Sequence, residues 1–257
     1  YSSIYSGGQD VIIRGKSGTT TSWFGGVGSW YYSWINSAKG EIIIKGDSTA
    51  NTGSYAAGVN LNYGSYNTTT RFISSSDDTV NGAISITGNA ATNSSGIDGA
   101  YYNYGTANTL VEATGNGGIN LTGTTANGSG WYGIDLNGAG ILSKSGDINI
   151  NGGTQGVRTA GWYSSVGVVT LGDMASSVAA DSLVTGATTR STANINITGD
   201  RVASYGNAAY LVINSTGNLN IQPFSSTSFN SNGMTWWATY GANLNTVTVG
   251  QDVGTGT

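Results

Sequence analysis

The stretch Asp147-Ile148-Asn149-Ile150-Asn151-Gly152 alternates β-branched apolar residues with polar residues and closes on glycine. Strict alternation of this kind predicts a strand with one face in a core and the other in water. The pattern recurs along the chain at residues 11–15, 42–46, 84–88, 119–123, 148–152, 195–199 and 219–223. Looser copies occur at 169–171 and 247–249, which close at Asp173 and Gln251. The chain is therefore built on an internal repeat.

The spacing of the copies predicts how the repeat folds. Successive closing residues are 31, 42, 35, 29, 21, 26, 24 and 28 positions apart. One strand cannot bury its apolar face alone, whereas coils that stack equivalent strands in parallel bury every copy. The shortest spacing extends to about 70 Å at roughly 3.3 Å per residue, enough for three short strands and three corners. We predict an all-β, single-domain parallel β-helix of about eight to nine coils, continuous over residues 1–257.

The copies also predict which side chains share a column. We expect one buried column to contain Val11, Ile42, Ile84, Ile119, Ile148, Ile195 and Leu219, and a second to contain Ile13, Ile44, Ile86, Leu121, Ile150, Ile197 and Ile221. The position between the columns points outward. It is asparagine in four copies, which indicates stacked side-chain amides at Asn120, Asn149, Asn196 and Asn220. In the first two copies it is Ile12 and Ile43, which we expect either a surface loop or another molecule to cover.

Two further strands per coil follow from shorter patterns. A glycine followed by a β-branched and a polar residue occurs at 58–61, 96–98, 133–136 and 156–158. A third candidate strand precedes the next copy, at 71–74, 109–112, 140–143 and 211–214. Gly and Asn between the strands suit corners, because both tolerate positive φ angles.

Composition excludes several classes of protein. The chain has 42 Gly, 1 Pro and only 9% charged residues, but the regular Ile placement argues against disorder. It has no Cys, hence no disulfide or thiolate metal site, and no run of 18 apolar residues that would predict a transmembrane segment. The net charge is -4 without a basic run, so nucleic acid is not an expected partner.

Little in the sequence favours catalysis. Without His, the chain has no Ser-His-Asp relay and no imidazole metal ligand. Asp77-Asp78 is the only adjacent acidic pair, and neighbouring strand residues face opposite ways. We predict no enzymatic activity, no catalytic residues, no metal and no cofactor.

Aromatic residues concentrate in the segments that follow the copies. One explanation is that they stack inside the coils or shield corners. The other is an exposed stripe that binds sugar rings or a neighbouring chain. Adjacent residues face opposite ways, so both can hold within one aromatic dipeptide. The candidate stripe residues are Trp30, Tyr31, Tyr102, Trp131, Trp162 and Trp236.

Three segments, Gly117-Gly118-Ile119-Asn120-Leu121-Thr122-Gly123, Ala193-Asn194-Ile195-Asn196-Ile197-Thr198-Gly199 and Thr216-Gly217-Asn218-Leu219-Asn220-Ile221, resemble repeats of filamentous-haemagglutinin-like exoproteins. The tract Ile221-Gln222-Pro223-Phe224 is similar to a segment of such chains. This resemblance implies a right-handed β-helix, export from a Gram-negative cell by a two-partner or autotransporter route, and a role in adhesion or surface structure.

We therefore expect a structural or adhesive segment of a secreted, extracellular cell-surface protein, with glycans or host or neighbouring cell surfaces as possible partners. The alternatives are a subunit of a homopolymeric extracellular filament and a polysaccharide-binding or depolymerising β-helix. Neither a polar terminal repeat nor a covering helix is evident at the ends. We therefore expect no native caps and stacking against further coils of a longer parent chain or other copies head to tail.

Overall fold

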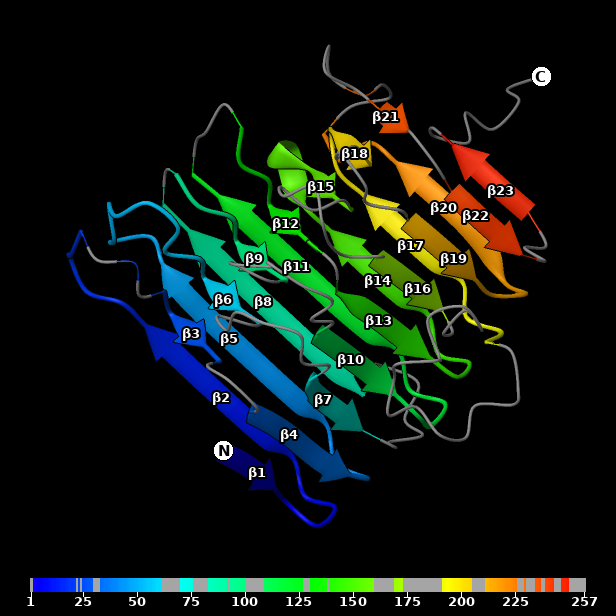
Figure 1. Cartoon of the computed structure of the whole chain (residues 1–257), viewed down its shortest axis with the longest axis horizontal. Coiled ribbons are helices and arrows are strands. Elements are labelled where there is room, and N and C mark those ends of the chain that lie inside the picture. The colour runs from blue at the N-terminus through cyan, green and yellow to red at the C-terminus, as the bar shows by residue number, and fades with distance from the viewer. Residues whose placement is uncertain are drawn as a thin grey trace.

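The chain forms an all-β structure of parallel strands (Figure 1). The computed structural model describes residues 2–21, 23, 25–29, 33–61, 70–75, 83–91, 93–99, 109–126, 130–137, 139–159, 169–172, 191–204, 211–225, 229, 234–236, 239–242 and 246–249. Within these residues the strands form two eight-stranded sheets and one seven-stranded sheet, which we call sheets A, B and C.

Sheet A contains β1 (Ser2–Tyr5), β4 (Ser33–Ala38), β7 (Thr70–Ser75), β10 (Thr109–Ala113), β13 (Gly140–Ser143), β16 (Val169–Gly172), β19 (Leu211–Asn214) and β22 (Thr239–Ala242). Sheet B contains β2 (Val11–Lys16), β5 (Ile42–Ser48), β8 (Ile84–Ala90), β11 (Ile119–Thr125), β14 (Ile148–Asn151), β17 (Ile195–Thr198), β20 (Asn218–Gln222) and β23 (Thr246–Val249). Sheet C contains β3 (Val27–Gly28), β6 (Val59–Asn60), β9 (Ile97–Asp98), β12 (Ile134–Asp135), β15 (Val157–Arg158), β18 (Val202–Ser204) and β21 (Met234–Trp236). A single 3₁₀ turn, η1 (Gly153–Gln155), interrupts the described strands.

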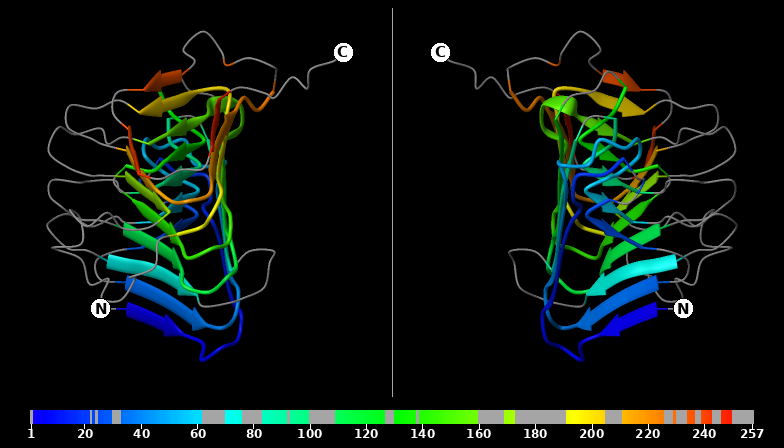
Figure 2. Two further views of the ribbon diagram at one scale, coloured as in Figure 1. Left: turned by 90° about the vertical axis from the view of Figure 1, so that its right-hand side faces the viewer. Right: turned by 90° about the vertical axis from the view of Figure 1, so that its left-hand side faces the viewer.

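The chain visits sheets A, B and C in turn, and each strand pairs in parallel with the strand three places further on. We call one such pass a coil and number the coils from the one that contains β1 to β3. This order is consistent with a parallel β-helix, and Figure 2 shows the strands of successive coils lying over one another around a narrow interior. All eight short segments predicted as second and third strands lie in sheets C and A respectively.

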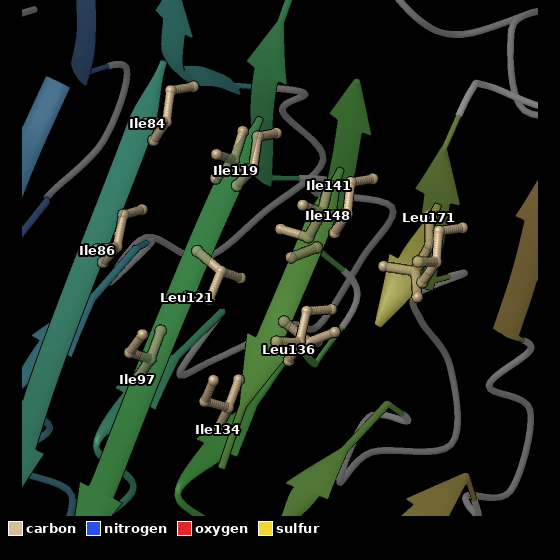
Figure 3. Packing of buried hydrophobic residues seen from close by; sticks show 14 of the residues in the cluster. Ile84, Ile86, Ile97, Ile119, Leu121, Ile134, Leu136, Ile141, Ile148 and Leu171 are labelled. Carbon is tan, nitrogen blue, oxygen red and sulfur yellow. The ribbon is translucent and has the colours of Figure 1, made fainter. Parts of the chain in front are cut away.

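The apolar columns predicted for sheet B are confirmed. The strands pair in the expected register, for example Ile84 with Ile119 and Ile119 with Ile148. The members of both columns are buried, except for the partly buried Ile13. Figure 3 shows Ile84, Ile119 and Ile148 side by side in neighbouring strands. The hydrophobic core is therefore a set of ladders that run along the stack.

One copy of the repeat was assigned to the wrong sheet. Residues 169–171 were predicted as a looser copy of the repeat, but they form β16 in sheet A, where Leu171 pairs with Ile141 and Ile213. An inward-facing strand alternates in the same way in any sheet, so alternation alone does not identify the sheet. The correct neighbour of Asn149 in sheet B is Asn196, 47 residues later.

The outward face of sheet B carries the predicted asparagine ladder. Asn149 Nδ2 donates to Asn120 Oδ1 at 2.9 Å, and Asn196 Nδ2 donates to Asn149 Oδ1 at 2.8 Å. Asn220 Nδ2 continues the chain to Asn196 Oδ1 at 2.8 Å. On the same face Ile12 is 55% exposed, so the expectation that a surface loop covers it is wrong.

Glycines join sheet B to sheet C by direct backbone contact. In five coils, a Cβ on the glycine that closes the sheet B repeat would lie only 2.0, 1.9, 2.0, 2.1 or 2.0 Å from the carbonyl oxygen of a second glycine that precedes sheet C. The pairs are Gly15 with Gly26, Gly46 with Gly58, Gly88 with Gly96, Gly123 with Gly133, and Gly152 with Gly156. Positive φ explains other corners, including Asn93, Gly130 and Gly156, but not the five closing glycines. The closing glycines are needed because no side chain fits between the two strands.

This contact predicts a position-specific cost for one methyl group. Gly123→Ala places Cβ 2.1 Å from the backbone oxygen of Gly133, so either strand must shift. We expect the free energy of unfolding to fall by about 1–3 kcal/mol or more in urea denaturation. Gly18→Ala, in a corner with nothing within 4 Å of the new Cβ, is the matched control and should be nearly silent. Equal effects of the two substitutions would contradict the glycine contact.

Candidate functional site

The predicted aromatic stripe falls mostly outside the described residues. Trp30, Tyr31, Tyr102 and Trp162 lie there, and Trp236 is located only as the last residue of β21. Trp131 is placed in full: it is partly exposed, in the loop between β11 and β12. Of the six candidate residues, Trp131 alone therefore has a described side chain, and the stripe stays a prediction.

Exposed aromatic residues also occur on the segments that follow the copies, at two positions that the candidate stripe did not include. The segments that join sheets B and C in the first four coils, residues 17–26, 49–58, 91–96 and 126–133, are called the BC loops here. Trp23 is 53% exposed on the first BC loop and Tyr55 is 38% exposed on the second. With Trp131 on the fourth, these rings form what we call the aromatic surface.

Tyr55 and Trp131 touch although they belong to coils that are not neighbours. Their ring centroids are 5.2 Å apart with an interplanar angle of 81°, an edge-to-face contact. Two steps of about 4.8 Å separate the strands of their coils. The two rings therefore lean toward each other across the third BC loop.

The backbone holds Tyr55 in an unusual conformation. Its φ angle is 69°, in the left-handed region that is costly for an aromatic residue. Its N–H donates to Asn93 O at 3.0 Å, and its own carbonyl accepts from Ala57 N at 3.0 Å. These bonds fix the strained residue with its ring outward, a position where glycine or asparagine would be the less costly choice.

Hydrogen bonds link the first three BC loops to one another, and the end of β11 to the third loop. The bonds run from Thr52 N to Thr20 O at 2.9 Å, from Tyr55 N to Asn93 O at 3.0 Å, and from Thr125 Oγ1 to Ala91 O at 2.7 Å. Because the first three loops are bonded together and the fourth follows directly from β11, their backbones keep a fixed spacing along the stack.

The neighbour of Trp131 points the other way. Tyr132 is 1% exposed, and the guanidinium carbons of Arg201 and Arg158 lie 3.7 and 5.2 Å from the centroid of its ring. Both distances are within the range of a cation–π interaction. The dipeptide therefore combines the two roles expected for such pairs: Tyr132 packs inside and Trp131 faces outward.

A buried polar column lies beside Tyr132 in sheet C. Asn60, Asp98, Asp135 and Arg158 are register neighbours, and all four are buried. Arg158 Nε donates to Asp135 Oδ1 at 3.0 Å, and a second guanidinium nitrogen donates to Oδ2. Burial raises the pKa of Asp135, while the charge and hydrogen bonds of Arg158 and the N–H of Asn137 oppose that shift. The pair connects two coils and leaves Asp135 without access to a substrate.

Removing the arginine should expose this electrostatic balance. Arg158→Met leaves a buried, unpaired carboxylate, and we expect the free energy of unfolding at neutral pH to fall by about 3–5 kcal/mol. In the variant, burial is no longer opposed by Arg158 and raises the folded-state pKa of Asp135 further above its unfolded value near 3.8. The loss in free energy of unfolding, relative to the unmodified chain, should therefore shrink as the pH falls toward 3.8, because Asp135 takes up a proton in the folded variant.

Two controls accompany this measurement by urea denaturation at several pH values. Asp135→Asn combined with Arg158→Met should lose the pH dependence. Lys16→Met, which breaks a solvent-exposed pair with Asp47 at 3.3 Å, should cost less than about 1 kcal/mol. If the loss in free energy of unfolding for Arg158→Met stays constant from neutral pH to pH 3.8, Arg158 does not balance the charge of a buried Asp135 carboxylate.

A second acidic side chain organises the loop after β20. Burial acts to raise the pKa of Asp200, but hydrogen bonds from the Ser225 hydroxyl and from the main-chain N–H groups of Ser225 and Phe224 more than offset it and hold the pKa below its usual value. The two main-chain bonds measure 2.7 and 2.8 Å. They fix a turn that presents Phe224, which is 49% exposed.

In the part of the chain that the structure describes, no three His, Cys, Asp or Glu side chains lie close enough together to hold a metal ion. Asp77 and Asp78 lie outside it. Nor does any described helix have the length and apolar character that crossing a membrane requires.

Comparison of the chain with family models, with curated proteins and with solved structures finds no match.

Proposed function

We propose that the chain is a structural or adhesive segment of a secreted β-helical protein on the outer surface of a Gram-negative bacterium. Residues 1–257 then form one continuous, right-handed β-helix. The two eight-stranded sheets support about eight coils, each with three short strands. The role of the rod is to hold its surface loops at a fixed spacing.

The unbroken inward columns of sheet B are the observation that carries this proposal. They run from β2 to β23, and each strand is in register with the next. Such a stack keeps one cross-section along its length, which suits an extended scaffold better than a single enclosed active site. The resemblance of residues 117–123 and 193–199 to filamentous-haemagglutinin-like repeats adds support for the surface location.

A non-enzymatic role is part of the proposal. The chain has no His, and the buried carboxylate of Asp135 is held by Arg158 and not presented to solvent. A general acid or base needs a titrating group within reach of a substrate. Among the described carboxylates, Asp135 and Asp200 are both committed to hydrogen bonds within the fold.

A filament subunit is the second candidate, and one observation favours it. Ile4 of β1 is the register partner of the buried Ile35 in sheet A, and Val247 and Val249 of β23 continue the columns of sheet B. At these two ends of the described stack they are 44, 58 and 47% exposed. A further coil would bury these side chains, whether it belongs to the same polypeptide or to a second copy. Burial by a second copy would extend the stack as a filament.

Immunoelectron microscopy of intact cells tests the proposed function. Antibodies against residues 1–257 should label extended structures on the outer surface, and protease added to intact cells should remove the label. Labelling that requires permeabilised cells and survives external protease would contradict the surface role. Light scattering of the purified chain separates the candidates: concentration-dependent growth that Val247→Lys abolishes would favour the filament.

A further inference from the structure

The BC loops of the first four coils share a chemical property beyond their aromatic rings: they contain no charged residue. Residues 17–26, 49–58, 91–96 and 126–133 include no Asp, Glu, Lys or Arg, and their polar side chains are Ser, Thr, Asn and Tyr. At the base of these loops the ammonium of Lys16 and the carboxylate of Asp47 are paired at 3.3 Å. A polyanion therefore finds no cationic surface on these loops.

The aromatic residues follow one another along the stack. Trp23, Tyr55 and Trp131 leave equivalent corners of coils one, two and four. Hydrogen bonds join the first three BC loops, and the rings of Tyr55 and Trp131 touch. Between the rings lie short hydroxyl and amide side chains, including the exposed Thr52 and Asn93. The aliphatic side chains of these loops are all alanine, so the apolar area is almost entirely aromatic.

The strained backbone at Tyr55 independently indicates that its ring has a functional role. A φ of 69° costs on the order of 1–3 kcal/mol for a residue of this type and is found where surrounding structure enforces it. The ring is only partly used in packing, because it remains 38% exposed beside Trp131. Stability alone would favour a smaller residue at this position.

We propose that the aromatic surface binds an uncharged polysaccharide that lies along the stack. Sugar rings present apolar C–H faces that stack on aromatic rings, and their hydroxyl groups pair with Ser, Thr and Asn side chains. The absence of charge on the loops disfavours nucleic acids and acidic polymers, which are drawn to basic surfaces. This binding surface does not depend on the proposed cell-surface role.

Affinity electrophoresis of the full chain tests the proposal, with gels that contain dextran, a linear β-1,3-glucan, a galactomannan or polygalacturonate. At least one of the three neutral polymers should retard the chain, and polygalacturonate should not. Tyr55→Asn and Trp131→Ala should each weaken the retardation by about two- to twelvefold. Tyr55→Asn also relieves the left-handed strain, so its Tm should be equal to or above that of the unmodified chain.

Trp34→Ala is the matched control, because this tryptophan is 59% exposed but lies on β4 in sheet A. It should leave the retardation unchanged. The proposal is wrong if none of the neutral polymers retards the chain, if both loop variants bind as well as the unmodified chain, or if Trp34→Ala weakens binding equally. Stronger retardation by polygalacturonate, or self-association that Trp131→Ala abolishes, would also overturn it in favour of an acidic ligand or a second copy.

Discussion

Burial of the inward aliphatic columns of sheet B is the constraint on which the rest of the structure depends. Each fully buried Ile or Leu contributes roughly 1.5–3 kcal/mol, and sheet B supplies two such residues from most coils. A shift of one residue would turn the amides of Asn149 and its stacked neighbours inward. The columns therefore set the register of sheet B, and sheets A and C take theirs from the same coils.

The glycine pairs determine where the chain leaves sheet B to form the BC loops. Because Gly88 and Gly96, or Gly123 and Gly133, meet through their backbones, the chain between them leaves sheet B as a loop. The BC loops can then carry exposed rings without disturbing the core. The buried ion pair of Asp135 and Arg158 joins β12 to β15 beside Tyr132. Because either charge would be costly to bury unpaired, the pair favours this register of sheet C.

Much of the fold could be predicted from the sequence, because period-two alternation and burial have a direct physical link. The columns, the three strands per coil and the asparagine ladder all depend on which residues face inward, and alternation reports that. Residues 169–171 were misassigned because alternation does not distinguish sheets. The aromatic surface was missed at Trp23 and Tyr55 because exposure depends on how loops of different coils meet, and the φ of Tyr55 has no local signature. The repeat showed that most copies close on glycine. It did not show why, because the backbone contact that requires glycine is made with a different segment.

The register of sheet B can be measured by cysteine cross-linking, since the chain contains no cysteine of its own. Ser85 and Asn120 are register partners on the outward face of β8 and β11, whereas Thr122 is the partner of Thr87. Adjacent parallel strands about 4.8 Å apart suit a disulfide, which forms poorly when the Cα atoms are more than about 7 Å apart. The account predicts that Ser85→Cys with Asn120→Cys oxidises readily and that Ser85→Cys with Thr122→Cys does not. Preferential cross-linking of the second pair, or equal cross-linking of both, would contradict the ladder of parallel strands.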